Sequence, residues 1–207
     1  MVVMQNDMNM KLRSYGLVGI ASVDPSVGVL LKYATEDNFM HMNLYGDLTE
    51  AYFVTEIAER LAHAQAKLKK ENPALTLLIY DAARPMSIQR QMFESVKGTD
   101  KEIYVASPED GGGFHNYGLA VDLTIADANG QALDMGSTFD CFNPVSHIGD
   151  EDRLVRSGLI SPQAKENRAL LGRCMTEAGF DRNPTEWWHF QRYSKEEMKA
   201  RFRLLDF

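Results

Sequence analysis

Two short segments carry the residue types that bind metal ions in proteins. The first runs from Phe114 to Asp122 and contains His115, and the second reads Glu186-Trp-Trp-His189. Neutral imidazole nitrogens and carboxylate oxygens are good zinc ligands, and a catalytic zinc site uses three protein ligands while the fourth position is left for water. We therefore predict that His115, Asp122 and His189 bind about one zinc ion per chain, and that Glu186 is the base that takes a proton from the metal-bound water.

Each of these residues also has an ordinary structural explanation when it is taken alone. A histidine before a strand is more often a hydrogen-bonded surface residue, and an aspartate inside an apolar strand is often paired with an arginine. Asp122 lies in the middle of such a strand, where an unpaired carboxylate is costly unless it faces a cation or a metal. Glu186 and His189 are three residues apart, so they can reach one metal only if the backbone turns between them, and Pro184 favours such a bend.

A second segment supplies an arginine at the end of a buried strand. It reads Tyr80-Asp-Ala-Ala-Arg-Pro85 and is followed by Gln89. Pro85 restricts Arg84 to an extended backbone, a position from which a guanidinium can be directed into a site. A peptide hydrolase must stabilise the oxyanion of its tetrahedral intermediate, and an arginine opposite the metal can do so. The alternative, equally favoured by this segment alone, is that Arg84 pairs with Asp81 and holds the loop.

The elements that must position these residues mix strands and helices without regular alternation, which is typical of the α+β class. Apolar runs between turn residues predict strands, and apolar residues at helical spacing predict helices. A glycine-rich loop over 98–113 is long enough to be functional. No linker or repeat divides the chain, so residues 1–207 are expected to form one catalytic domain. The expected strands are 17–22, 27–33, 75–80, 119–126, 131–135 and 186–192; the expected helices run from Asp47 to about Lys70, from Ser87 to about Val96, from Ser161-Pro162 to Gly179, and after the capping pair Ser194-x-x-Glu197.

Composition excludes several classes of protein. The 207 residues are 44% hydrophobic and 25% charged, which is the balance of an ordinary globular protein. A net charge of −7 has the wrong sign for a surface that binds nucleic acid. No apolar run approaches the roughly 18 residues that a membrane-spanning helix needs.

The N-terminal region and the cysteines bear on the compartment. Residues 10–23 superficially resemble a secretory signal, but the glycines inside the apolar stretch and the following Asp24-Pro25 favour a strand. Cys141 and Cys174 are expected to be free thiols. We expect a cytoplasmic protein; the sequence leaves open a removed upstream signal and the formation of homo-oligomers.

Three motifs follow one another along the chain: Ala83-Arg-Pro-x-x-x-Gln89, His115-x6-Asp122 and Glu186-x-x-His189. Together they resemble the signature set of the M15 zinc peptidases, and in particular of the VanX-type D-alanyl-D-alanine dipeptidases. Two further stretches, 31–39 and 134–140, support that branch. The resemblance runs from about Leu17 to His189, and the motifs in this order are far more specific than any one of them.

The resemblance implies a fold and a set of roles. The fold is the small α+β zinc-peptidase domain shared with the D,D-carboxypeptidases and with the signalling domain of Hedgehog proteins, in which helices pack on a central antiparallel sheet. The three residues named above would be the zinc ligands, Glu186 the general base, and Arg84 the residue that polarises the scissile carbonyl and stabilises the transition state. The pattern differs at one position, because the dipeptidases carry a serine two residues before the first histidine, where it helps to hold the substrate ammonium, and this chain has Gly113.

The leading hypothesis is a zinc dipeptidase whose partner is a small dipeptide substrate, D-alanyl-D-alanine. The ammonium of a dipeptide in a partly desolvated pocket needs an anionic partner, and Asp140 is the candidate, with a turn or helix-cap role as its alternative. The alternative functions are a D,D-carboxypeptidase that trims longer wall peptides and a non-catalytic zinc module. Glu186 argues against the module, because a structural zinc needs no base beside it. His41 and His147 stay outside the ligand set, and His147 is expected to form a structural hydrogen bond.

Overall fold

A five-stranded sheet forms the centre of the molecule. The computed structural model describes residues 5–207. The strands of this sheet, in spatial order, are β2 (Gly28–Val29), β4 (Thr76–Asp81), β5 (Ala120–Ala126), β7 (Glu186–Gln191) and β6 (Asp181–Asn183). β2 pairs with β4 in parallel, and the other neighbours pair antiparallel. The prediction of an α+β fold with a central antiparallel sheet is confirmed, with the difference that one short edge strand is parallel.

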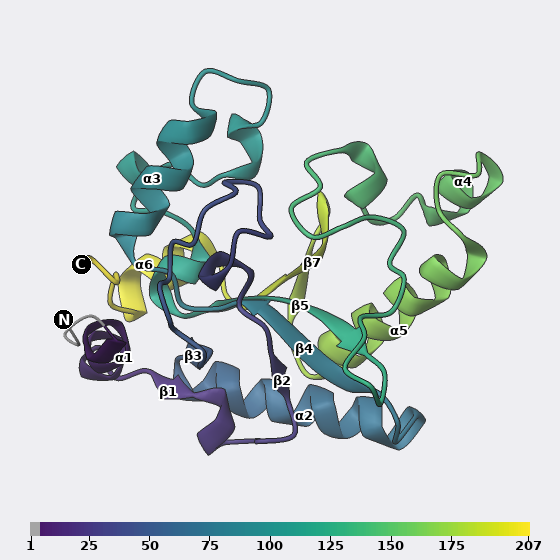
Figure 1. The fold of residues 1–207 in the computed structure, drawn as a ribbon, viewed down its shortest axis with the longest axis horizontal. Coiled ribbons are helices and arrows are strands. Elements are labelled where there is room, and N and C mark those ends of the chain that lie inside the picture. Colours follow the sequence, from purple (N-terminus) through teal and green to yellow (C-terminus); the bar gives the residue numbers. More distant parts are fainter. Residues whose placement is uncertain (1–4) are drawn as a thin grey trace.

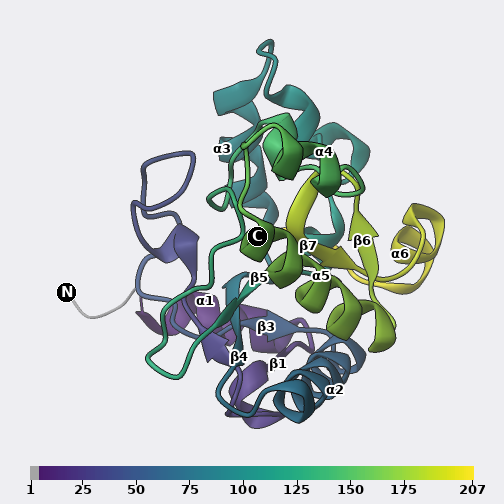
Figure 2. The same cartoon turned by 90° about the vertical axis from the view of Figure 1, so that its right-hand side faces the viewer.

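Two long helices cover one face of this sheet (Figure 1, Figure 2). They are α2 (Thr55–Glu71) and α5 (Pro162–Glu177), and they contact each other as well as the central strands. The apolar residues of α2 recur every three or four positions, and Ile57, Leu61 and Leu68 are fully buried. The opposite face of the sheet is covered by long loops, and the candidate site lies on that face.

The remaining elements are short. The helices are α1 (Gln5–Ser14), α3 (Met86–Val96), α4 (Glu151–Arg156) and α6 (Lys195–Arg201), and β1 (Val18–Gly19) pairs antiparallel with β3 (Tyr52–Phe53) apart from the main sheet. Two predicted helix starts are confirmed. Oγ of Ser161 accepts a hydrogen bond from the N–H of Ala164, and Ser194 and Glu197 form a reciprocal capping box.

Two other predicted helix starts are wrong. The helix expected from Asp47 begins at Thr55, because the intervening residues of β3 are held by pairing with β1. The helix expected to be capped by Ser87 begins one residue earlier, at Met86, with Pro85 in the cap position. In both places the surrounding backbone outweighed a side-chain capping signal.

The N-terminal region also differs from the prediction. The strand expected over 17–22 is reduced to β1, and residues 20–22 form a 3₁₀ turn. α1, which precedes it, was not predicted. The hairpin expected around Asn129-Gly130 is present only as a single bridge between Ala126 and Ala132.

The main buried cluster extends from Leu12 to Leu205. β5 is buried along its whole length and β4 along nearly all of it, so the polar side chains on these strands need partners inside the protein. Both cysteines are free thiols. Among the residues that the structure describes, no helix has the length and apolar character needed to cross a membrane.

Candidate active site

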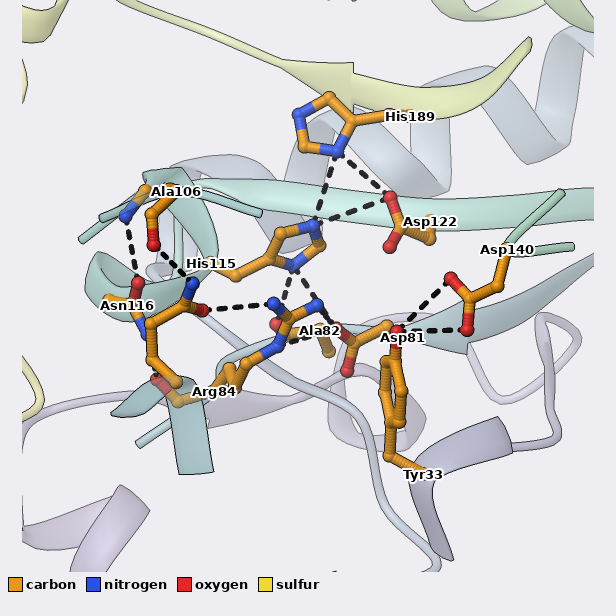
Figure 3. A network of polar contacts seen from close by, with 12 residues as sticks. Tyr33, Asp81, Ala82, Arg84, Ala106, His115, Asn116, Asp122, Asp140 and His189 are labelled. Carbon is orange, nitrogen blue, oxygen red and sulfur yellow. Dashed lines mark hydrogen bonds and ion pairs between the residues drawn. The ribbon is translucent and has the colours of Figure 1, made fainter. Parts of the chain in front are cut away.

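The three predicted metal ligands converge on the loop-covered face of the sheet. Asp122 of β5 and His189 of β7 are directly opposite each other, and His115 reaches them from the 3₁₀ turn Phe114–Tyr117 that precedes β5 (Figure 3). All three residues are buried. Nε2 of His115 lies 3.2 Å from Nδ1 of His189 and 3.3 Å from Oδ1 of Asp122, and Nδ1 of His189 lies 2.9 Å from the same Oδ1.

These separations fit a tetrahedral metal site. A zinc ion with bonds of about 2.0–2.1 Å to nitrogen and oxygen places neighbouring ligand atoms roughly 3.3 Å apart. Two imidazole nitrogens and a carboxylate oxygen that face one another repel through their lone pairs unless protons or a metal ion lie between them. The residues therefore fit the metal site that the sequence predicts.

Each histidine is oriented by a hydrogen bond from the ring nitrogen that points away from the cluster. Nδ1 of His115 lies 2.8 Å from the carbonyl oxygen of Ala82, and Nε2 of His189 lies 3.1 Å from Oε1 of Gln191. Since a carbonyl oxygen can only accept, both of these nitrogens donate. In the neutral form of each ring the other nitrogen has a lone pair that can bind a metal, which is the usual arrangement around ligating histidines.

The charges of the cluster favour a bound cation. Burial raises the pKa of Asp122, but the facing His115 and His189 outweigh it and hold that pKa well below its usual range. Burial lowers the pKa of His189, but its hydrogen bond to Asp122 and the charge of that carboxylate outweigh the effect and raise the pKa to about 9. Without a metal, Asp122 is therefore ionised and His189 carries a proton at neutral pH.

Glu186 borders the same cavity as the three ligands. The pairing of β6 with β7 is irregular here, because Arg182 is opposite Phe190 whereas the next residue, Asn183, is opposite Glu186. β7 therefore bulges between Glu186 and Phe190. A bulge is needed here because residues three apart in a regular strand, such as Glu186 and His189, would point to opposite faces of the sheet. Oε2 of Glu186 accepts a hydrogen bond of 2.7 Å from Nδ2 of Asn183, and burial raises the pKa of Glu186. A carboxylate with a raised pKa is suited to accept a proton.

Arg84 lines the cavity and is held by several partners. Its guanidinium forms an ion pair with the fully buried Asp81, and Nη1 donates to Oε1 of Gln89 at 3.0 Å. The guanidinium also lies over the ring of Tyr33, 5.2 Å from its centroid. The backbone N–H of Arg84 donates to the carbonyl oxygen of His115 at 2.9 Å. The pairing with Asp81 is therefore present, and Arg84 borders the same cavity as the three predicted ligands.

Asp140 lines the same cavity and lies against Tyr33 (Figure 3). Its carboxylate accepts hydrogen bonds from Oη of Tyr33 at 3.1 and 3.0 Å and from the N–H of Phe39 at 3.3 Å. Burial and the nearby charge of Asp122 raise the pKa of Asp140 well above its usual range. Among the described residues it forms no ion pair, so a cation brought into the cavity would find an acceptor here.

The cavity that these groups line has a volume of about 260 Å³. A family model described as Peptidase M15, D-ala-D-ala dipeptidase, matches residues 13–204, a range that contains every predicted site residue. The chain belongs to this family. Metal-dependent peptide hydrolysis is the family's chemistry, and the buried His115, Asp122 and His189 are consistent with its metal site.

Individual relatives carry the same description. The chain is 33% identical over 178 residues to the D-alanyl-D-alanine dipeptidase of Escherichia coli (strain K12), a match that covers 84% of this chain and 83% of the relative. It is 29% identical over 182 residues to the D-alanyl-D-alanine dipeptidase of Enterococcus faecium, covering 77% and 82%. The solved structure of the LdcB LD-carboxypeptidase is similar at 24% identity with a TM-score of 0.38, covering 72% of this chain and 63% of that chain.

In this M15 dipeptidase family member, Gly113 lies at the edge of the cavity. Its N–H donates to Oδ1 of Asn116 at 2.8 Å. A Cβ at Gly113 would lie 3.1 Å from Cβ of Ala106, so the serine of the family pattern would need the 98–113 loop to move slightly. The glycine therefore accompanies a close approach between two parts of this loop, at Ala106 and at Gly113, both of which line the cavity.

The two histidines left out of the ligand set do not border the dipeptidase cavity. Nε2 of His147 lies 3.4 Å from Oη of Tyr104. His41 borders a separate cavity. Neither residue contacts the three ligands, so the set of His115, Asp122 and His189 needs no addition.

Sequence reasoning missed several residues that support the site. Gln191 is two residues after His189, so the alternation of a strand was an available signal that both lie on one face. Asn116 donates to the carbonyl oxygen of Arg84 at 2.8 Å, and it directly follows a predicted ligand. Tyr33 lies in the stretch 31–39 that supports the family resemblance, but no role was predicted for it.

Proposed function

We propose that the protein is a zinc-dependent dipeptidase that hydrolyses D-alanyl-D-alanine, and that residues 1–207 act as one catalytic domain. The observation that carries the proposal is the spacing of His115, Asp122 and His189, which matches the edges of a zinc tetrahedron. Glu186 borders the same cavity. The family match and the names of the relatives support the substrate class.

The roles follow from the chemistry of each side chain. Zinc, held by the three ligands, would polarise the scissile carbonyl and make a water acidic enough to lose a proton near neutral pH. Glu186 accepts the proton of the attacking water and passes it to the leaving amine. Arg84 donates to the carbonyl oxygen as negative charge develops there, because Asp81 and Gln89 hold its guanidinium in place.

Asp140 receives the free ammonium of the dipeptide. Its half-buried carboxylate forms no ion pair with any residue that the structure describes, and two partners, Tyr33 and Phe39, fix its direction. An ammonium that loses its water in the cavity requires such a partner. An N-acylated peptide has a neutral amide in place of the ammonium, so this contact favours dipeptides over longer wall peptides.

The experiment that tests the proposal is a hydrolysis assay of the zinc-loaded protein. The substrates are D-Ala-D-Ala, its L,L and L,D diastereomers, and a pentapeptide that ends in D-Ala-D-Ala. We expect cleavage of the D,D dipeptide alone. Preferred cleavage of the pentapeptide would favour the D,D-carboxypeptidase, and zinc binding without hydrolysis of any substrate would favour the non-catalytic module. Cytoplasmic location and oligomeric state stay predictions of the sequence.

A further inference from the structure

Arg168 of α5 is a buried charged residue that has no part in the proposed mechanism. It is 1% exposed, and it forms no ion pair with any residue that the structure describes. Its guanidinium donates instead to three backbone carbonyl oxygens, those of Met135 at 2.6 Å, Val145 at 3.0 Å and His147 at 3.4 Å. A buried guanidinium is costly unless its donors are satisfied, so these carbonyls keep Arg168 in the interior.

The three carbonyls belong to the two ends of one loop. We call residues 135–147, which run in green beside β7 in Figure 1, the Asp140 loop. Ser146, which lies between two of the residues bound by Arg168, donates to the carbonyl oxygen of Cys141 at 2.7 Å. Cys141 directly follows Asp140. A short series of contacts therefore connects the guanidinium to the backbone at the proposed ammonium-binding residue.

The Asp140 loop separates two cavities. The active-site cavity of about 260 Å³ lies on one side, and a second cavity of about 800 Å³ lies on the other. Asp140 and Phe142 border both. Met135, Phe139 and Phe142 pack against the main buried cluster, and polar contacts such as those of Arg168 supply the other anchors of the loop.

The backbone at Asp140 also needs support. Its φ is +58°, in the left-handed region that side-chain-bearing residues rarely adopt. Such a conformation costs free energy and persists only where the surrounding structure enforces it. Ser137 contributes to that support, because its Oγ accepts from Nε1 of Trp187 at 2.8 Å and contacts Oγ of Ser146 at 3.0 Å.

We propose that Arg168 is a positioning residue for substrate recognition: by binding both ends of the Asp140 loop, it keeps the carboxylate of Asp140 directed at the ammonium of the substrate. The inference rests on the proposed function, and specifically on the role of Asp140. Arg168 lies outside the cavity and touches no reacting atom, so its effect is on binding and not on the chemical step.

The test compares two variants with one control. Arg168→Lys keeps a positive charge but cannot bind three carbonyls in a planar fork. Ser146→Ala leaves Arg168 in place and removes the link to Cys141. The control is Arg173→Lys, which changes an exposed arginine of the same helix that pairs with Glu71. Zinc content and unfolding temperature establish that each variant is folded and loaded.

Two readouts separate positioning from a general loss of structure. Hydrogen exchange of the backbone amides over 136–146 should be faster in Arg168→Lys and in Ser146→Ala, with the rest of the protein and Arg173→Lys unchanged. The KM for D-Ala-D-Ala should rise about 10-fold to 100-fold in Arg168→Lys, the range for losing a hydrogen bond to a charged group, while kcat changes little.

The test separates two claims, that Arg168 anchors the Asp140 loop and that this anchor serves substrate binding. Unchanged exchange over 136–146 in the folded Arg168→Lys variant would overturn the anchoring role, whether or not the protein hydrolyses peptides. Faster exchange with an unchanged KM, or an equal fall in kcat and in kcat/KM, would show that the anchor does not serve substrate binding. If the unmodified protein does not hydrolyse D-Ala-D-Ala, the proposed function fails, and the exchange measurement alone decides whether Arg168 holds the loop.

Discussion

Nδ1 of His189 lies 2.9 Å from Oδ1 of Asp122, the residue directly opposite it in the neighbouring strand. Antiparallel pairing of β5 and β7 therefore brings together two groups that are far apart in the sequence. Both strands are central in the sheet, so these two ligand atoms are held by a rigid element, whereas His115 is held by the 3₁₀ turn before β5. A site built in this way is largely formed before a metal binds.

We expect zinc binding to release about one proton per chain at pH 7. The pKa of His189 is raised to about 9 by Asp122 in the absence of metal, whereas only the neutral imidazole can bind zinc. Calorimetric titrations in buffers of different ionisation enthalpy count the released protons. The number should fall as the pH rises through 9, and no release at pH 7 would show that His189 is not the protonated group.

Gln191→Leu should weaken zinc binding by about 10-fold to 100-fold, which is typical for the loss of an outer partner of a ligating histidine. The reason is that Oε1 of Gln191 orients the ring of His189. Competition with a chelator of known affinity measures the change. Gln91→Leu is the control, because its side chain bonds only the carbonyl of Ser87 on an exposed surface; equal effects in both variants would refute the role.

Arg84→Lys should lower kcat much more than it raises KM, as for an interaction that is stronger in the transition state than in the ground state. Lysine keeps the charge but loses the planar fork that contacts Asp81 and Gln89 together. Steady-state kinetics on D-Ala-D-Ala provide the measurement. If kcat is unaffected, the role of Arg84 is restricted to holding the loop.

Asp140→Asn should mainly harm the hydrolysis of dipeptides with a free amine. The amide keeps the size of the side chain and its contacts with Tyr33 but removes the negative charge that an ammonium needs. The ratio of kcat/KM for D-Ala-D-Ala to that for its N-acetyl derivative is the measurement, with an upper limit where the latter is not cleaved. An unchanged rate on the free dipeptide would remove Asp140 from the ammonium site.

The grouping of His115, Asp122 and His189 was predictable because their side chains are of the types that bind metals, and Asp122 needs a partner in its apolar strand. Two local patterns pointed to this site. One is a carboxylate, Asp122, in the middle of the apolar strand β5, and the other is the three-residue spacing of Glu186 and His189 in β7, whose pairing with β6 is irregular. Strand β4 and the starts of α5 and α6 were likewise readable from apolar runs and capping residues. That residues 1–207 form one domain stays a prediction.

Other features depend on contacts between distant segments and left no local signal. The start of α2 is set by pairing of β3 with β1, which a capping pattern at Asp47 does not reveal. Arg168 lies on α5, where the sequence predicted no role for it, and the fold shows that it is buried against a loop. Tyr33 and Phe39 lie in the stretch 31–39 that supports the family resemblance, but their contacts with Asp140, about a hundred positions away, are visible only in the fold.

The most direct test of the account is the zinc content and the turnover of D-Ala-D-Ala in Glu186→Gln. Glu186 is proposed to accept a proton and not to bind the ion, so the variant should retain about one zinc per chain. Its kcat should fall by about 10²-fold to 10⁴-fold, the range of general base catalysis. A zinc-loaded Glu186→Gln protein that hydrolyses D-Ala-D-Ala at the unmodified rate would contradict the account.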